Sequence, residues 1–339
     1  MSKFLKKSTP LIFAGIGEVL FDVFEDGTET LGGAPLNFAV HVHQLADQLG
    51  VGQGIIVSSI NSSDTRGHKI IESLERRNIS TRYIGEDVHH PTGLVSVYMK
   101  NGEPGYQIEA DAAWDYISYK PELVELAGQC SAICFGSLAQ RSSLSRSTIR
   151  SFLANSPPEA IRLYDVNLRQ NTLTGETGYS QEIIGYSCQT ATILKSNQSE
   201  LFQIFDILEI KCPSDNSIEG IKRRMEILLD RFPVKTIIIT RGDRGTLSLD
   251  KDGEFDLTRL EPAESTPNPV GAGDACSAGI LFGLTLGWDI HKTMELANRM
   301  GADVAGHPSA TPPLSEDTIK FAKENLNGPT MSFRTKREI

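Results

Sequence analysis

Short apolar runs alternate with longer segments of helical periodicity through most of this chain. Two such runs, Ile237-Ile238-Ile239 and Ala132-Ile133-Cys134-Phe135, are continuously apolar, which is typical of strands buried on both faces. Between such runs, apolar residues recur at a helical spacing, as at positions 36, 39, 42, 45 and 49. This alternation predicts an α/β fold, a doubly wound and mostly parallel sheet with helices on both faces.

The same patterns give the approximate positions of the elements. We expect strands at 11–17, 54–59, 130–135, 162–166, 192–195 and 236–240, helices at 35–49, 65–77, 145–153, 199–207, 220–230, 274–286 and 290–305, and a hairpin of 247–249 with 255–257. Two stretches break the alternation, and each predicts a hairpin: 19–31, and 93–108 with Asn101-Gly102 at its turn. Together they predict a small β-sheet lid on a single domain of residues 1–339. We expect the lid to consist of the segments 18–32 and 92–110, and residues 328–339 to form a flexible tail.

Composition and charge argue against several classes of protein. The chain has 339 residues, 39% hydrophobic and 22% charged, which is ordinary globular composition. A net charge of −10 without a compensating basic stretch argues against a nucleic-acid partner. The apolar run at 11–16 is too short for a signal peptide, and no run is long enough to span a membrane. The five cysteines form no C-x-x-C pair, so we expect reduced thiols in a soluble, cytoplasmic protein with no membrane partner.

The stretch from Asn268 to Gly279 contains the main candidate for a site. Gly271, Ala272 and Gly273 form a tight turn into a buried helix, whose first N–H groups lack internal partners and carry the positive end of the dipole. An anion can bind there, and Asp274 beside it suits a base that takes a proton from a nucleophile. A glycine-rich turn with Asp274 as a helix cap explains the same residues, so this stretch alone does not distinguish an anion site with a base from a structural turn.

Two motifs near the N-terminus suit hydroxyl groups. Gly32-Gly33-Ala34-Pro35-Leu36-Asn37 precedes the first long helix, and Gly17-Glu18-x-x-x-Asp22 leaves a strand end. Asp22 beside Asn37 would make a pair that accepts from and donates to adjacent sugar hydroxyls. The glycines fit a structural turn equally well.

Polar groups also follow a later strand, where ligands of such sheets bind. In Asp165-Val166-Asn167-Leu168-Arg169, alternation in an extended chain would place Asp165, Asn167 and Arg169 on one side. The alternative is an Asp–Arg pair that closes a loop.

Two further strand ends carry candidate groups for a nucleotide. In the segment 195–200, Asn197 and Glu200 suit a phosphate-bound Mg²⁺ through water, or else they cap the next helix. The segment 240–245, Thr-Arg-Gly-Asp-Arg-Gly, is a weak motif that also fits a simple turn.

In order and content, these motifs resemble the ribokinase-like (PfkB) carbohydrate kinases, most closely the fructokinase and 2-keto-3-deoxygluconate kinase branch. The resemblance runs from about residue 13 to residue 313. The motifs at 32–37, 165–169 and 271–274 are specific in combination, and Ala-Ala-Trp-Asp at 112–115 also looks like that branch.

The resemblance implies transfer of the γ-phosphate of ATP to a primary hydroxyl of a small sugar, with Mg²⁺ as cofactor. Asp274 would be the catalytic base, and the backbone of Gly271, Ala272 and Gly273 the anion hole. The other implied contacts are Asp22, Gly33, Asn37, Tyr106 and Arg169 with the sugar, Asn197, Thr240, Gly242, Gly245 and Asn298 with the nucleotide, and Glu200 with Mg²⁺ through water. Fructose is the favoured sugar, with 2-keto-3-deoxygluconate, ribose or a nucleoside as alternatives. A homodimer through the lid is also expected.

Two departures from the family pattern affect these expectations. Asn268 stands where the family usually has Asp, which bears on the rate. Residues 306–310, Gly-His-Pro-Ser-Ala, replace a turn that builds a K⁺ loop in many members, so a K⁺ requirement stays open.

One alternative to an enzyme is a regulatory protein that binds a sugar without turnover, with Asn268 as its only support. A nicotinamide dehydrogenase is disfavoured, because Gly15-Ile16-Gly17 lacks the third glycine of that motif.

Overall fold

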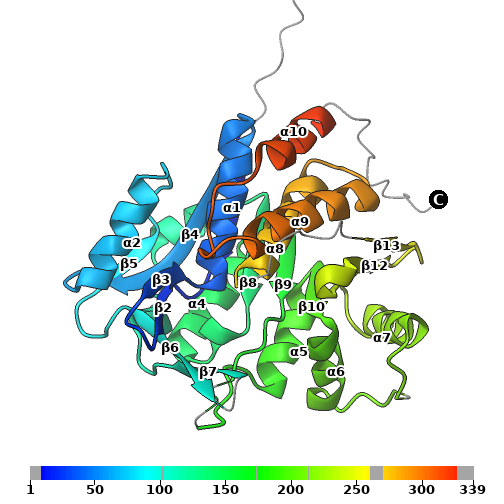
Figure 1. Cartoon of the computed structure of the whole chain (residues 1–339), viewed down its shortest axis with the longest axis horizontal. Helices are drawn as coiled ribbons and strands as arrows, with labels where there is room; N and C mark the ends of the chain where they lie inside the picture. The colour runs from blue at the N-terminus through cyan, green and yellow to red at the C-terminus, as the bar shows by residue number, and fades with distance from the viewer. Residues whose placement is uncertain are drawn as a thin grey trace, which may run out of the picture.

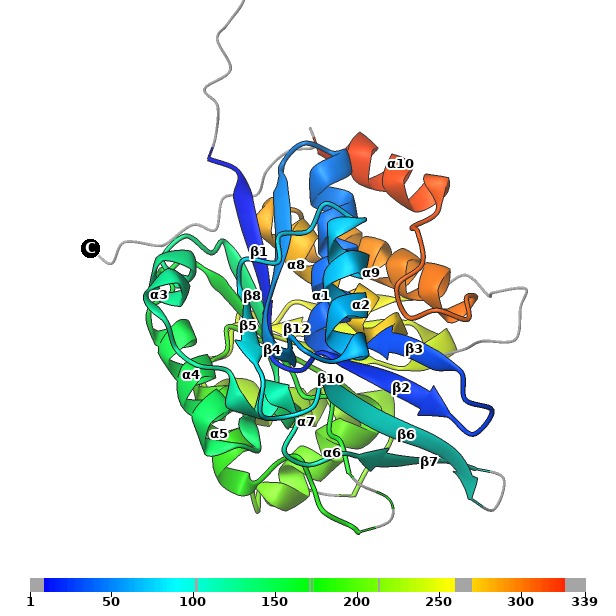
Figure 2. The same cartoon turned by 90° about the vertical axis from the view of Figure 1, so that its left-hand side faces the viewer.

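The computed structural model describes residues 9–100, 103–170, 172, 174–212, 214–259 and 270–326. Within these residues one large sheet has the strand order β13-β12-β11-β10-β9-β8-β1-β4-β5 (Figures 1 and 2). Its strands are β1 (Leu11–Ile16), β4 (Gly52–Asn61), β5 (Ile84–Asp87), β8 (Ala132–Gly136), β9 (Ile161–Asp165), β10 (Ile193–Asn197), β11 (Thr236–Thr240), β12 (Thr246–Asp250) and β13 (Phe255–Thr258). The pairs from β5 to β11 are parallel, and β12 and β13 add an antiparallel edge.

Helices cover both faces of this sheet (Figure 2). One face carries α1 (Ala34–Gln48), α2 (Thr65–Glu75), α8 (Ala272–Thr285), α9 (Ile290–Ala305) and α10 (Glu316–Asn325), and the other α3 (Pro121–Ala127), α4 (Ser143–Ala154), α5 (Gln181–Thr190), α6 (Gln198–Ile207) and α7 (Ile218–Arg231). Successive side chains of β11 enter opposite cores: Ile237 and Ile239 pack with the α5–α7 side, and Ile238 packs with the α8–α9 side. The continuous apolar strands are therefore buried on both faces, and the predicted α/β fold class is confirmed.

A second, smaller sheet projects from the large one (Figure 2). It has the order β3-β2-β6-β7, with β2 (Leu20–Phe24), β3 (Glu29–Gly32), β6 (Gly93–Lys100) and β7 (Glu103–Ile108). Both expected hairpins form, and they join through parallel pairing of β2 with β6. The Asn101-Gly102 turn lies outside the described residues, as do Asn268 and the expected tail 328–339.

Some elements were not predicted from the sequence. The helices α3, α5 and α10 and the four-residue edge strand β5 have no counterpart among the expected elements. Strand β5 has four residues and α3, which begins at Pro121, has seven, so neither gives a long periodic pattern of apolar residues. The described cysteines are free thiols, of which all but the half-buried Cys212 are buried. No helix in the described ranges is long and apolar enough to cross a membrane.

Candidate active site

The N-terminus of α8 is shaped by Gly271. This residue has φ +82°, and a Cβ added to it would lie 2.7 Å from the carbonyl oxygen of Ala310, so only glycine fits without strain. The carbonyl oxygen of Gly271 accepts from the N–H groups of Asp274 (3.1 Å) and Ala275 (3.0 Å), which starts the helix. The N–H groups of Ala272 and Gly273 therefore precede the first intrahelical bond and are available to an anion.

Asp274 lies in the first turn of α8, half-buried and held by a neighbouring helix. Its Oδ2 accepts a hydrogen bond of 2.8 Å from Nδ2 of the buried Asn37 on α1. Burial and the nearby Asp165 raise the pKa of Asp274 to about 6, although Asn37, Lys195 and Arg169 lower it. The carboxylate is therefore ionised at neutral pH but more basic than an exposed aspartate, as a general base requires.

Three of the expected sugar residues, Asp22, Gly33 and Asn37, lie where β2, β3 and α1 meet. Gly33 has φ +107°, and a Cβ there would lie 2.5 Å from the carbonyl oxygen of Glu18. Gly32 leaves room for Asp22, whose Oδ2 would lie 2.9 Å from a Cβ at position 32. Burial raises the pKa of Asp22 to about 6, and the Arg169 charge lowers it. Asn37 offers a further acceptor, because its buried Oδ1 has no hydrogen-bond partner in the described structure.

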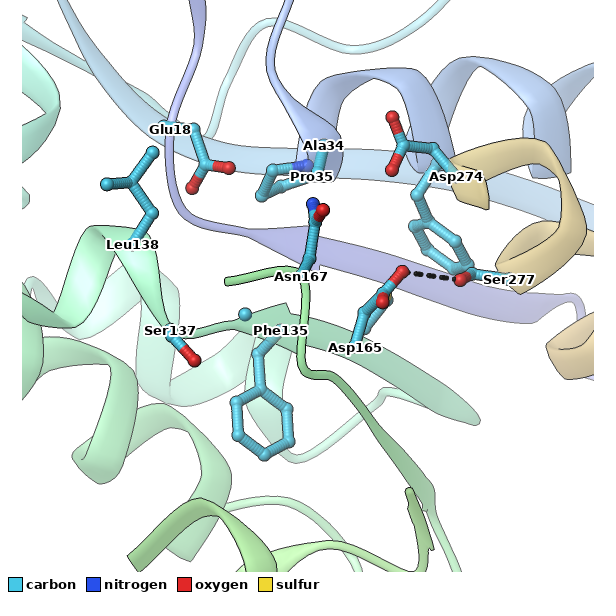
Figure 3. A pocket seen from close by; sticks show the side chains of 13 residues that line it. Glu18, Ala34, Pro35, Phe135, Ser137, Leu138, Asp165, Asn167, Asp274 and Ser277 are labelled. Carbon is cyan, nitrogen blue, oxygen red and sulfur yellow. Dashed lines mark hydrogen bonds between the residues drawn. The ribbon is translucent and has the colours of Figure 1, made fainter. Parts of the chain in front are cut away.

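The polar residues after β9 do not share one side of an extended chain, so that expectation is wrong. Asn167 has φ +36°, and this left-handed residue ends the alternation directly after the strand. Asp165 is buried and Asn167 lines the cavity (Figure 3). Arg169 is exposed. Arg169 still acts on the site at longer range, since its charge lowers the pKa values of Asp22 and Asp274.

A buried ion pair lies beside the first turns of α8. Nζ of Lys195 lies 2.7 Å from Oδ2 of Asp165, which also accepts from Oγ of Ser277 at 2.8 Å. The same Ser277 hydroxyl approaches the carbonyl oxygen of Gly273 at 3.1 Å. Neither Lys195 nor Ser277 is among the site residues predicted from the sequence. The only signals were the position of Lys195 at a strand end and that of Ser277 four residues after Gly273.

Asn197 and Glu200 form a capping box at the start of α6. Oδ1 of Asn197 accepts from the N–H of Glu200, and Oε2 of Glu200 accepts from the N–H of Asn197, both at 2.8 Å. Oε1 of Glu200 accepts from the N–H of Leu168 at 3.1 Å. The helix-capping alternative is thus correct, and it leaves only the remaining lone pairs of Glu200 for a metal-bound water.

The remaining candidates lie nearer the antiparallel edge and on the lid. Thr240 ends β11, and Gly242 (φ +60°) and Gly245 (φ +76°) bound a single 3₁₀ turn. No atom lies within 4 Å of a Cβ placed on Gly242, so the backbone there is open to a ligand. Asn298 is buried on α9, and its Nδ2 donates to the carbonyl oxygen of Thr258 at 3.3 Å. Tyr106 is exposed on β7 of the lid.

A small cavity lies at the carboxyl ends of β1, β8 and β9, beside the N-termini of α1 and α8 (Figure 3). Its polar lining includes Asp165, Asn167, Asp274 and Ser277, together with Glu18, to which the sequence analysis assigned no role. Acidic groups therefore surround a space that ends at the positive terminus of α8.

The chain is similar to known proteins in sequence and in structure. The model of the pfkB family of carbohydrate kinases matches residues 22–317. A sugar kinase of Pyrococcus horikoshii is 26% identical over 305 residues, covering 86% of this chain and 89% of that protein. An ATP-dependent 6-phosphofructokinase of Thermoanaerobacterium thermosaccharolyticum is 26% identical over 318 residues, covering 90% and 91%.

Solved structures show the same fold. The crystal structure of the Pyrococcus horikoshii sugar kinase covers 93% of this chain and 99% of its own, with a TM-score of 0.74 at 24% identity. A Vibrio cholerae fructokinase bound to fructose, ADP and a potassium ion covers 93% and 99%, with a TM-score of 0.73 at 18% identity.

Proposed function

Because the chain belongs to the pfkB family of carbohydrate kinases and is a sugar kinase that uses ATP, we propose that it phosphorylates a primary hydroxyl of a small sugar, with fructose as the substrate. The observation that carries this proposal is that Asp274 lies next to the N–H groups of Ala272 and Gly273, which have no partner within α8. A base and an anion site adjoin there at the end of one cavity. Phosphoryl transfer to a hydroxyl requires both at one place.

In the proposed reaction, Asp274 takes the proton of the attacking hydroxyl as the new O–P bond forms, and the bond from the γ-phosphorus to ADP breaks. Asn37 donates a hydrogen bond to Oδ2 of Asp274 and so orients the carboxylate. The N–H groups of Ala272 and Gly273 donate to the phosphoryl oxygens, where negative charge develops. Lys195 balances the buried charge of Asp165 under this turn.

The residues present fit Mg²⁺ that is held mainly by nucleotide phosphates. No group of three metal-binding side chains occurs in the described ranges, and both oxygens of Glu200 already accept backbone N–H groups. Glu200 therefore suits a metal-bound water rather than direct coordination. When bound, Mg²⁺ would neutralise charge on the phosphates. Asn197, Thr240, Gly242, Gly245 and Asn298 remain the proposed contacts of the nucleotide.

The sugar site is proposed to be formed by Asp22, Gly33 and Asn37, with Tyr106 of the lid and Arg169 at its edge. The Trp114-Asp115 motif contributes indirectly, since both residues are buried. Asp115 is held by Arg141, with Nε at 2.9 Å from Oδ1 and Nη2 at 2.7 Å from Oδ2. The Arg141 guanidinium also lies 4.1 Å from the centre of the Trp114 ring. This motif therefore anchors the end of the lid to the body of the protein.

A cytoplasmic location is proposed because it suits the free thiols. A homodimer formed by the pairing of two lids also remains a proposal.

A phosphorylation screen tests the proposed substrate. Purified protein with ATP and Mg²⁺ is given fructose, ribose, 2-keto-3-deoxygluconate, adenosine or fructose 6-phosphate, and ADP release and the phosphorylated product are measured with and without K⁺. We expect the highest kcat/KM with fructose. A higher value with any other acceptor would replace fructose as the substrate, and sugar-independent ADP release alone would contradict sugar kinase activity.

A further inference from the structure

Glu18 is a buried carboxylate in the active-site cavity that plays no part in the reaction as described above. It follows β1 directly, and only 6% of its surface is exposed. It lines the same cavity as Asn167 and Asp274. Figure 3 shows its carboxyl group pointing inward among the lining residues, with Asp274 on the other side.

One oxygen of Glu18 lacks a partner. Within the described structure, its buried Oε2 makes no hydrogen bond. Burial raises the pKa of Glu18 to about 7, against the lowering effect of its own backbone N–H and of Arg169, and the charge of Asp274 raises it further. A buried acceptor without a donor is unfavourable, so such a group in a cavity requires a donor from a ligand or from a water molecule that a ligand hydroxyl can replace.

A purely structural role explains only part of this side chain. The backbone N–H of Ala34, the first residue of α1, also lowers the pKa of Glu18, so the carboxyl group lies close enough to help support the turn at Gly33. A single acceptor oxygen is enough for that task, and short side chains usually supply it at helix N-termini. The capping role therefore leaves Oε2 and its place in the cavity unexplained.

We propose that Glu18 is a sugar-binding residue whose Oε2 accepts a hydrogen bond from a second hydroxyl of the sugar that presents its primary hydroxyl to Asp274. This inference rests on the proposed sugar kinase function. Contacts with carboxylates on two sides fix the orientation of the sugar, so that one hydroxyl faces the base. In its ionised form, Glu18 also disfavours a sugar acid that places its carboxylate beside it.

Kinetics of two variants test the contact. We expect Glu18→Gln and Glu18→Ala to raise the KM for fructose about 10- to 100-fold, the loss expected for one hydrogen bond to a charged group. The KM for ATP should change less than about twofold, because none of the proposed nucleotide contacts lines the cavity with Glu18. Glu159→Gln, at an exposed position between α4 and β9, is the matched control and should behave as the wild type.

Deoxy analogues of fructose separate direct contact from support of the turn. In the wild-type enzyme, removal of the contacted hydroxyl should lower kcat/KM about 10- to 100-fold. In Glu18→Ala that penalty should disappear, since the partner of the hydroxyl is already gone. A penalty that persists undiminished for every analogue would overturn the proposal, as would equal increases in the KM values for fructose and ATP.

The experiments distinguish an error in the Glu18 contact from an error in the choice of fructose as the substrate. If the wild type prefers another neutral sugar of the screen, the same variants and the deoxy analogues of that sugar are used, and the expected pattern is unchanged. If the wild type phosphorylates no sugar, the proposed function and this inference are both overturned. If the wild type phosphorylates a sugar and the Glu18 variants have the same KM for that sugar as the wild type, this inference alone is overturned.

Discussion

Replacement of Asp274 by asparagine removes the proposed base while keeping its hydrogen bond. The side-chain oxygen of an asparagine can still accept from Nδ2 of Asn37, which lies 2.8 Å from Oδ2 of Asp274. The helix start at Gly271 involves only backbone atoms, so it should persist as well. The change is therefore confined to the charge and basicity of one group.

The size of the effect follows from the role of the base. General base catalysis contributes about 10²- to 10⁴-fold, which corresponds to about 3–5 kcal/mol of transition-state stabilisation. We therefore expect kcat of Asp274→Asn to fall by about that factor, with the KM for the sugar within about threefold of the wild type.

The assay is a coupled measurement of ADP release with saturating ATP and a series of sugar concentrations. Asp230→Asn is the matched control, because Asp230 is exposed near the end of α7, away from the cavity. A kcat for Asp274→Asn within tenfold of the wild type would refute the assignment of Asp274 as base. A rise in KM at unchanged kcat would show that Asp274 only binds the sugar.

Three further outcomes follow from the same site. Because Asp274 must be ionised to accept a proton and its pKa is about 6, while that of Glu18 is about 7, kcat/KM should rise with pH between about 6 and 7 and level off above this range, and a profile that is flat from pH 5 to 8 would contradict this. Gly271→Ala, with φ +82° and a clash with Ala310, should lower both the melting temperature and kcat, and unchanged values of both would show that the turn tolerates a side chain. Lys195→Met leaves the buried Asp165 without its counter-charge and should lower the free energy of unfolding by about 3–5 kcal/mol, measured by urea denaturation, so a loss below about 1 kcal/mol would contradict the account of this pair.

The sequence predicted most of the fold because its main signals are local. Residues 237–239 are apolar on both sides of a strand, and the burial of their side chains in two cores follows directly. The helix expected at 290–305 forms at Ile290–Ala305. Short edge elements such as β5 have no such pattern, and the pairing of β2 with β6 joins segments far apart in the chain.

The site was predictable where a motif fixes the backbone. Gly33 and Gly271 have the positive φ values that glycine permits, and Asn37 meets Asp274 across 237 residues of sequence. The arrangement after β9 was wrong, because alternation assumes an extended chain and Asn167 turns it. The place of Glu18 depends on packing around β1 and α1, which a lone glutamate in the sequence does not reveal.

The most direct test of the central claim is a crystal structure of the protein with fructose, Mg²⁺ and a non-transferable ATP analogue. We predict a primary hydroxyl about 2.6–3.2 Å from the carboxylate of Asp274 and the γ-phosphate analogue at the N–H groups of Ala272 and Gly273. A sugar bound with every hydroxyl beyond hydrogen-bond distance of Asp274, or a γ-phosphate held away from the N-terminus of α8, would contradict the account.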